Sequence, residues 1–250
     1  MTYFGHESIW LDTVTSTNDY ASFLLDFQPP AEGYAILAKD QTKGRGQFGK
    51  KWVSNKNENL LVSYIIYPAF LNLNDHFMLN VFTSLAVRDV LSSFLDEEVF
   101  IKWPNDIYVN QKKLAGILIQ NAISQKVIKS SVVGIGINVN QNSFDAGVEN
   151  ASSLRLITGE IFTLKEVWEK LNEFMTRYYQ MMKLHDGIDT LKLLYTSYLF
   201  GLNRITKFED LKDQNTFTGI IRGINSNGRL KIEIRGKIKA FDLGEIKFIF

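Results

Sequence analysis

The sequence changes character at Gly201-Leu202-Asn203, and this change constrains the fold more than any other feature. Before it, strand patterns alternate with helical ones, which favours an α+β domain: a mixed sheet with helices packed on one face. After Arg204 only short alternating strands remain, at 216–224, 229–234, 237–243 and 245–250, separated by turns. We predict two domains, residues 1–202 and a small β-barrel at 203–250.

Hydrophobic spacing predicts the elements of the first domain. The expected strands are 34–38, 60–67, 100–102, 107–109, 114–119 and 129–138. The expected helices are 16–27, one capped by Asn74 or Asp75, one beginning at 163, and 188–199. Thr163-Leu164-Lys165-Glu166 is a capping box, which places the start of the third helix.

Composition narrows the function classes. The 250 residues are 45% hydrophobic and carry a net charge of +1, which argues against a general binder of DNA or membranes. There is no cysteine, so thiolate nucleophiles, disulfides and zinc–thiolate sites are excluded. The most apolar stretch, 60–71, is too short to span a bilayer, and the first ten residues lack a secretory core. We expect a cytoplasmic protein.

One polar hairpin concentrates residues that carry chemistry. It reads Lys102-Trp103-Pro104-Asn105-Asp106, then a tight reversal at Asn110-Gln111, then Lys113-Leu114-Ala115-Gly116. The pairing of its strands brings Lys112 and Lys113 close to Asn105 and Asp106. The alternative interpretation is a hairpin with solvated charges.

A glycine-rich loop, 44–51, combines three glycines with several cations. It fits the G-x-G-x-x-G dinucleotide pattern and nearly fits the P-loop, but no helical pattern follows it. Lys51 also stands where a P-loop requires a hydroxyl. We interpret the loop as an anion site built from backbone N–H groups and cations, with Trp52 as an exposed indole that stacks on a planar group. A solvated surface loop is the alternative.

Taken together, these stretches resemble the biotin protein ligases over nearly the whole chain. The motifs that carry the resemblance occur in the family order: Ser16-Thr17-Asn18, Gln41 with the loop 44–52, the 102–106 and 113–116 segments, Gly134-Ile135-Gly136-Ile137-Asn138, and the 223–230 turn. The resemblance implies a catalytic domain like that of class II aminoacyl-tRNA synthetases, of biotin/lipoate ligase type, followed by a Src-homology-3-like barrel.

The resemblance also implies an activity. ATP, with Mg²⁺, activates biotin to biotinyl-5′-AMP and pyrophosphate, and biotin then passes to a lysine of a biotin carboxyl carrier protein. The catalytic residues implied are Lys113, Arg45 and Asp106. The implied biotin-binding residues are Ser16, Thr17, Asn18, Gln41, Gly44, Arg45, Gly46, Gln47, Lys113, Gly116 and Gly136. The implied nucleotide-binding residues are Arg45, Trp52, Asn105, Lys113 and Asn138. No residue is assigned to the metal.

Two departures from the family pattern matter. The Ser16-Thr17-Asn18 motif begins too early for a preceding winged-helix domain, so we expect a ligase without DNA binding. Gln47 replaces a common second arginine, which weakens the electrostatic grip on the intermediate or moves it to Lys50 or Lys51. A lipoate or octanoate ligase of the same fold, and a non-catalytic biotin or nucleotide sensor, are the alternative functions. Homodimerisation is left open.

Overall fold

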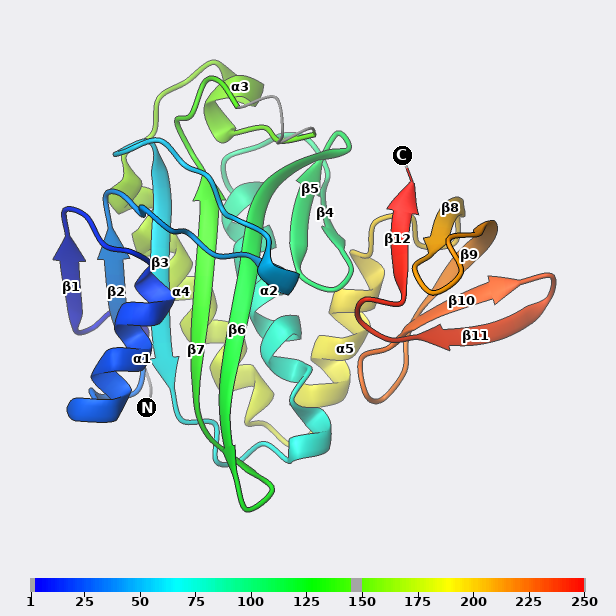
Figure 1. Ribbon diagram of the computed structural model, residues 1–250, viewed down its shortest axis with the longest axis horizontal. Coiled ribbons are helices and arrows are strands. Elements are labelled where there is room, and N and C mark those ends of the chain that lie inside the picture. The colour runs from blue at the N-terminus through cyan, green and yellow to red at the C-terminus, as the bar shows by residue number, and fades with distance from the viewer. Residues whose placement is uncertain (1–2, 145–149, 250) are drawn as a thin grey trace.

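The computed structural model describes residues 3–144 and 150–249, and a seven-stranded sheet is its largest part (Figure 1). In spatial order its strands are β1 (Ser8–Leu11), β2 (Tyr34–Ala38), β3 (Asn59–Ile66), β7 (Val127–Asn138), β6 (Lys112–Ser124), β5 (Asp106–Val109) and β4 (Val99–Lys102). The β1–β2 pair is parallel, and every other pair is antiparallel. The sheet is therefore mixed, as the sequence predicted.

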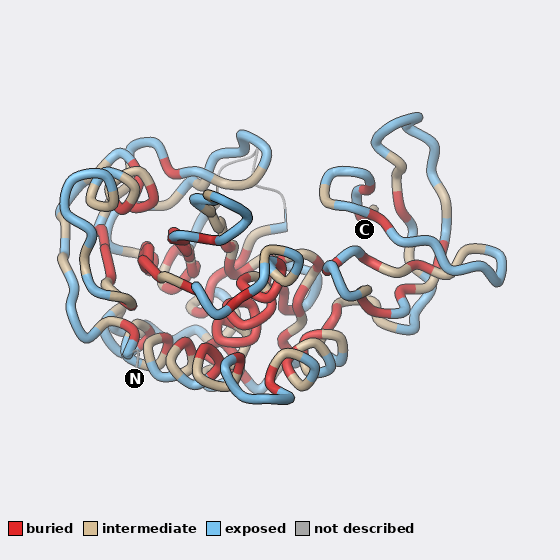
Figure 2. Tube along the Cα trace, turned by 90° about the horizontal axis from the view of Figure 1, so that it is seen from below, coloured by how far each residue is buried: buried red, intermediate tan, exposed pale blue. Residues whose placement is uncertain are grey.

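Helices cover both faces of this sheet, unequally. The helices are α1 (Thr17–Phe27), α2 (Met78–Ser92), α3 (Leu154–Thr158), α4 (Leu164–Met182) and α5 (Gly187–Ser197). Helices α2, α4 and α5 form a layer behind the sheet, where most buried segments gather (Figures 1 and 2). Helix α1 lies on the opposite face, where Ala21 packs on Ile36, Ile65 and Val132. The predicted grouping on one face thus holds for three long helices, while α1 is the exception.

The fold differs from the sequence-based expectation in a few local features. Helix α2 begins after Phe77, because Asn74 and Asp75 belong to a separate 3₁₀ turn at Leu73–Asp75. Edge strand β1, the short α3 and the first strand of the C-terminal segment, at Ile205–Asp210, were not predicted. The capping box is confirmed: the Thr163 hydroxyl accepts a hydrogen bond from the Glu166 N–H at 3.2 Å.

The C-terminal segment folds into a five-stranded antiparallel sheet. Its strands, in spatial order, are β11 (Lys237–Phe241), β10 (Leu230–Ile234), β9 (Thr216–Ile224), β8 (Ile205–Asp210) and β12 (Ile246–Ile249). Phe241 pairs through Leu230 with Ile224, yet its ring stacks on Phe217 at 5.6 Å. Phe217 and Ile224 are both in β9, and in an extended strand they would lie about 23 Å apart. The sheet therefore curls upon itself, as a small barrel does.

This C-terminal sheet packs against the polar hairpin of the large sheet. The Trp103 indole N–H donates a hydrogen bond to the Gly228 carbonyl at 2.9 Å, and Phe77 lies against Gly228. Leu202 already bridges to Ile221 of β9. A domain boundary between residues 202 and 203 stays a prediction. No helix within residues 3–144 and 150–249 is long and apolar enough to cross a membrane.

Candidate active site

A cavity of about 700 Å³ opens on the face of the large sheet that carries α1. Its walls come from the start of α1, the glycine-rich loop, strands β6 and β7, the polar hairpin and the region around β12. This volume suits a small-molecule ligand. Most of the predicted site residues line it: Ser16, Thr17, Asn18, Gln41, Arg45, Gly46, Gln47, Trp52, Asp106, Lys113, Gly116 and Gly136.

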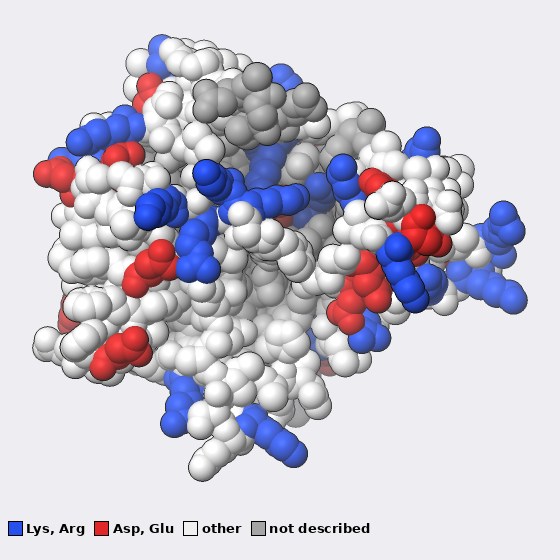
Figure 3. All heavy atoms as spheres, in the orientation of Figure 1, with Lys and Arg blue, Asp and Glu red and all other residues white. Residues whose placement is uncertain are grey.

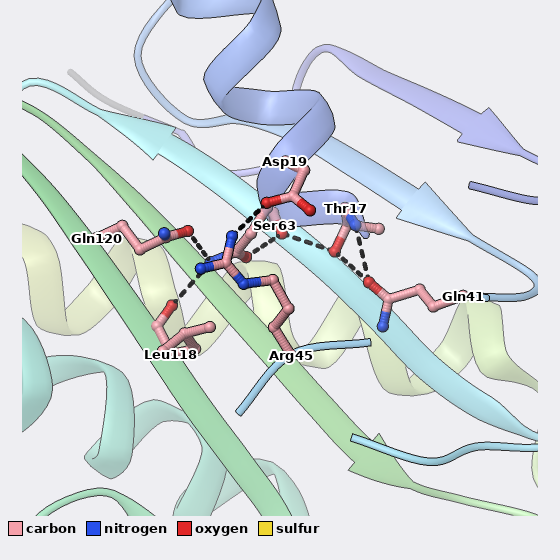
Figure 4. Close-up of polar contacts among 8 residues, drawn as sticks. Thr17, Asp19, Gln41, Arg45, Ser63, Leu118 and Gln120 are labelled. Atoms are coloured by element: carbon pink, nitrogen blue, oxygen red, sulfur yellow. Dashed lines mark hydrogen bonds and ion pairs between the residues drawn. The ribbon is translucent and has the colours of Figure 1, made fainter. Parts of the chain in front are cut away.

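One end of the cavity is a polar network at the start of α1 (Figure 4). The Thr17 N–H and hydroxyl both donate to the Gln41 Oε1, at 2.8 and 3.1 Å. The Ser63 hydroxyl lies 2.7 Å from both Thr17 Oγ1 and Asn18 Oδ1. Asn18 Nδ2 donates to Gln120 Oε1 at 2.9 Å. These buried and half-buried amide and hydroxyl groups are held in defined orientations, because each is fixed by a partner from another element.

Two features of this end were not expected from the sequence. Ser16 occupies the N-cap position of α1, but its side chain makes no capping hydrogen bond, so plain capping does not explain the motif. Ser63 was missed as a site residue. The only signal for it is a small hydroxyl residue within an otherwise apolar buried strand, β3.

The floor of the cavity is formed by two paired glycines. Gly116 of β6 and Gly136 of β7 face each other in the ladder, and the Trp52 indole lies over both. A Cβ atom at Gly136 would lie 2.5 Å from Trp52 Cε2, and one at Gly116 would lie 3.0 Å from Trp52 Cζ3. The prediction of an exposed indole was wrong: Trp52 is half-buried, since the side-chain-free floor lets its ring rest on the sheet.

Positive charge dominates the rest of the cavity wall. The lining cations are Arg45, Lys50, Lys51, Lys102, Lys113 and Lys247, and Asp106 is the one carboxylate among the described residues that line it. Figure 3 shows blue side chains gathered across the centre of this face. Such an excess of one sign in a concave site favours an anionic ligand.

Two of these cations are held by ion pairs. Lys113 Nζ lies 2.6 Å from Asp106 Oδ1, with both side chains less than one-third exposed. A register shift in the β5–β6 pairing places Lys113 opposite Tyr108, from where it reaches back to Asp106. Arg45 lies 2.5 Å from Asp19 of α1, in a more exposed pair (Figure 4). Arg45 and Lys113 therefore come from separate segments and border one cavity.

Lys102 also lines the cavity. It is the first residue of the 102–106 motif, but no role in catalysis or binding was predicted for it from the sequence. Burial lowers the pKa of its ammonium group, against the opposing effect of the Asp106 carboxylate, while the nearby cations Lys113, Lys50 and Lys247 lower it further. Tyr108, beside it, has a raised pKa, because burial and Asp106 disfavour its phenolate.

Three predicted site residues do not line the cavity. Asn105 is buried and donates to the Ile117 carbonyl at 2.8 Å and to Asn80 of α2, so it faces the helical layer instead of a nucleotide. Asn138 is buried and donates to the Ser152 carbonyl at 2.9 Å, so its amide group belongs to the core. Gly44 is needed by the loop itself, because a side chain there would collide with the Trp52 carbonyl.

No group of three or more His, Cys, Asp or Glu side chains that could hold a metal ion occurs within residues 3–144 and 150–249. Any cation at this cavity would therefore depend on ligand atoms as well as on Asp106.

Comparison with known proteins places the chain in a family. Residues 10–138 match the Biotin/lipoate A/B protein ligase family, which is more than half of the chain. The chain belongs to this family. Residues 201–248 match the Biotin protein ligase C terminal domain.

Individual relatives of this ligase family agree with the assignment. The Bifunctional ligase/repressor BirA of Bacillus spizizenii is 31% identical, over 97% of this chain and 74% of its own. The Biotin--[acetyl-CoA-carboxylase] ligase of Mycobacterium tuberculosis is 25% identical over 86% of this chain and 79% of its own. Among solved structures, the biotin protein ligase from Aquifex aeolicus in complex with biotin and ATP has a TM-score of 0.82 and 28% identity, covering 98% of this chain and 99% of its own.

Proposed function

We infer that this chain is an ATP-dependent biotin protein ligase. In the first half-reaction a biotin carboxylate oxygen attacks the α-phosphorus of ATP, and the bond to the bridging oxygen of the β-phosphate breaks. Biotinyl-5′-AMP forms and pyrophosphate leaves. In the second half-reaction a lysine amine of a biotin carboxyl carrier protein attacks the activated carbonyl, AMP leaves, and an amide forms. Family membership and the printed activities of the relatives support this assignment.

The observation that carries the proposal is the convergence of Arg45 and Lys113 on one cavity with an oriented polar end. The first half-reaction must bring a carboxylate against a triphosphate. Two unit charges about 4 Å apart repel by roughly 4 kcal/mol at an effective dielectric of 20. Fixed cations offset that repulsion, and their effect increases as charge develops in the transition state. We assign this role to Arg45 and Lys113.

The polar end suits the ureido group of biotin. Its donors and acceptors match the buried groups of Ser16, Thr17, Asn18 and Gln41, while the Gly116–Gly136 floor allows close approach. We also assign the loop backbone at Gly46 and Gln47 to biotin. Trp52 is proposed to stack on the adenine ring, because its indole lines the cavity and is held close to the two glycines of its floor.

Asp106 is proposed to act in the second half-reaction. A carboxylate beside the activated carbonyl orients the incoming lysine and accepts its proton. Its ion pair with Lys113 couples the two half-reactions, since the carboxylate becomes available when Lys113 turns to the phosphates. Mg²⁺ supplies charge neutralisation of the ATP phosphates when bound. The residues fit this through Asp106 alone, because Mg²⁺ takes one or two carboxylates together with phosphate oxygens.

One experiment tests the function directly. The protein is incubated with ATP, Mg²⁺ and either biotin or lipoate, and mass spectrometry detects the mixed anhydride while a coupled assay measures pyrophosphate. We expect biotinyl-5′-AMP with biotin and no adenylate with lipoate. A lipoyl adenylate would indicate the related ligase activity. Biotin binding without any pyrophosphate would contradict the ligase and indicate a sensor.

A further inference from the structure

Lys102 occupies an unusual place between the two sheets. It is the last residue of β4, it lines the cavity, and its side chain lies between an aromatic ring of each sheet. Its Nζ is 5.1 Å from the centre of the Tyr108 ring and 5.3 Å from that of Phe248. Tyr108 belongs to β5, next to Lys102, whereas Phe248 belongs to β12 of the C-terminal sheet. Aromatic faces attract a cation without neutralising its charge.

The charges that face Lys102 come from every element around it. Asp106, opposite it in the β4–β5 register, is negative, but Lys113 also pairs with that carboxylate. Lys113 of β6, Lys50 of the loop and Lys247 of β12 add three positive charges. A partly buried cation is electrostatically destabilised by the other cations around it. A bound polyanion would attract all of these cations, so the Lys102 charge would be stabilised instead of repelled.

We propose that Lys102 is a catalytic residue that contacts the phosphates of the nucleotide, and that Phe248 positions it. The inference rests on the ligase function proposed above. When the bond between the α-phosphorus and the bridging oxygen breaks, the electron pair goes to the departing pyrophosphate. The Lys102 ammonium stabilises that developing charge, while Lys113 and Arg45 act on the carboxylate and the α-phosphate.

The C-terminal sheet thereby becomes part of the catalytic machinery. Phe248 covers Lys102 from that side, and Trp103, the next residue, is tied to Gly228 of the same module by its hydrogen bond. The C-terminal sheet thus contacts Lys102 through Phe248 and holds the adjacent residue, Trp103, through Gly228. Preorganised charge of this kind is effective because it needs no reorganisation during the reaction.

The first test compares Lys102→Met and Lys102→Arg with Lys112→Met, a control on the same hairpin whose residue is exposed and outside the cavity wall. Biotin-dependent pyrophosphate release is measured at a fixed pH over a range of ATP and biotin concentrations. We expect Lys102→Met to lower kcat by about 10²–10³-fold, with Lys102→Arg restoring most of it and Lys112→Met near wild type.

The division of the effect between kcat and KM separates a catalytic role from a structural one. Because the Lys102 charge is proposed to act on the departing pyrophosphate, Lys102→Met should lower kcat while the KM for biotin stays near wild type. Lys102→Arg keeps a positive charge at the same position and should restore kcat. Unchanged kcat in Lys102→Met, or a kcat in Lys102→Arg as low as in Lys102→Met, would overturn the catalytic role.

The second test addresses Phe248. Phe248→Leu removes the ring above Lys102, and Phe208→Leu is the matched control, because Phe208 packs on Phe248 at 5.1 Å in the same core without a contact to Lys102 in the described residues. Both variants should lower the Tm of the module. Only Phe248→Leu should reduce kcat, by about 10-fold or more, with the KM for biotin unchanged. Equal kinetics in the two variants would overturn the positioning role.

These outcomes remain distinct from the fate of the ligase function. If the wild-type protein forms no biotinyl-5′-AMP, the proposed function fails. If it does form the adenylate while Lys102→Met retains its rate, only the inference about Lys102 fails.

Discussion

At the scale of single residues, the site depends on where charges and glycines are placed. Lys113 and Asp106 form a short, partly buried pair, and Gly134 leaves room for the Asn18 amide that anchors the polar end. Lys113 and Gly134 contact different groups, so substitution of Lys113 should affect the chemical step and substitution of Gly134 should affect biotin binding.

Lys113→Ala should lower the rate of adenylate formation by about 10²–10³-fold, the scale for removal of one electrostatic donor. The physical reason is that the Lys113 ammonium is fixed beside Asp106 and beside Gly116 of the glycine floor, where the carboxylate and the α-phosphate are proposed to meet. Single-turnover pyrophosphate release measures this rate, with Lys112→Ala as the control from the same strand. A near-normal burst in the Lys113 variant would remove Lys113 from the mechanism.

Gly134→Ala should weaken biotin binding and lower stability by about 1–3 kcal/mol, the usual cost of overpacking. A Cβ atom there overlaps Asn18 Oδ1, so Asn18 must give up its bonds to Ser63 and Gln120. Calorimetry with biotin and thermal unfolding measure the two effects. Val132→Ala, on the same face of β7, should lower stability alone. Wild-type biotin affinity in Gly134→Ala would contradict the assignment of the polar end.

At the scale of elements, the glycine-rich loop forms a small hairpin that lines one side of the cavity. The Gly46 N–H donates to the Lys50 carbonyl at 2.7 Å, and the Trp52 N–H donates to the Gly44 carbonyl at 3.0 Å. Phe48 at its tip has a left-handed φ of 53°, and its ring lies beside Gly244, between β11 and β12, where a Cβ atom would be 3.5 Å from it. A strained, exposed aromatic residue at this contact indicates that the loop is held partly by the C-terminal sheet.

Amide hydrogen exchange in residues 44–51 should slow when biotin and ATP are added together. The effect should be largest at Arg45, Phe48 and Lys51, whose amides make no backbone hydrogen bond among those described for the loop. The β6–β7 turn at Gln125-Lys126, at the other end of the sheet, is the internal control (Figure 1). Unchanged exchange at 44–51 would exclude closure of this loop on the ligands.

At the scale of the whole molecule, the two sheets share the cavity. The C-terminal sheet contributes Lys247 and Phe248 to the wall, and the Trp103–Gly228 hydrogen bond connects residues 125 positions apart. The Tyr195 hydroxyl donates to the Pro104 carbonyl at 2.6 Å, so α5 holds the same hairpin from the other side. The hairpin is thus the point where three parts of the molecule meet.

Trp103→Phe should lower the free energy of unfolding by about 2–4 kcal/mol and should also slow adenylate formation. The smaller Phe ring leaves part of the buried Trp103 site unfilled and cannot donate to Gly228. Chemical denaturation and pyrophosphate release measure the two effects. Trp168→Phe, in α4 and away from the cavity, is the control for loss of an indole. Slowed chemistry in the control as well would show that the coupling is not specific to the hairpin.

The sequence by itself determined the local features of this protein. The strand at 34–38, the Thr163 cap, the hairpin around Asn110-Gln111 and the change in pattern near Gly201 follow from residue periodicity and turn chemistry, which act over a few positions. The same local patterns predicted that Lys113 lies close to Asp106, because the two residues are on consecutive strands of one hairpin. Family motifs supplied the activity that these local signals alone left open.

Only the tertiary structure decided which groups share the cavity and which face away from it. Asn105 faces α2 instead of the cavity, and α1 covers the second face of the sheet. Ser63, Lys247 and Phe248 belong to the site although no nearby motif marks them. The physical reason is that these contacts join segments distant along the chain. Their formation depends on the packing of whole sheets and helices, which local periodicity does not encode.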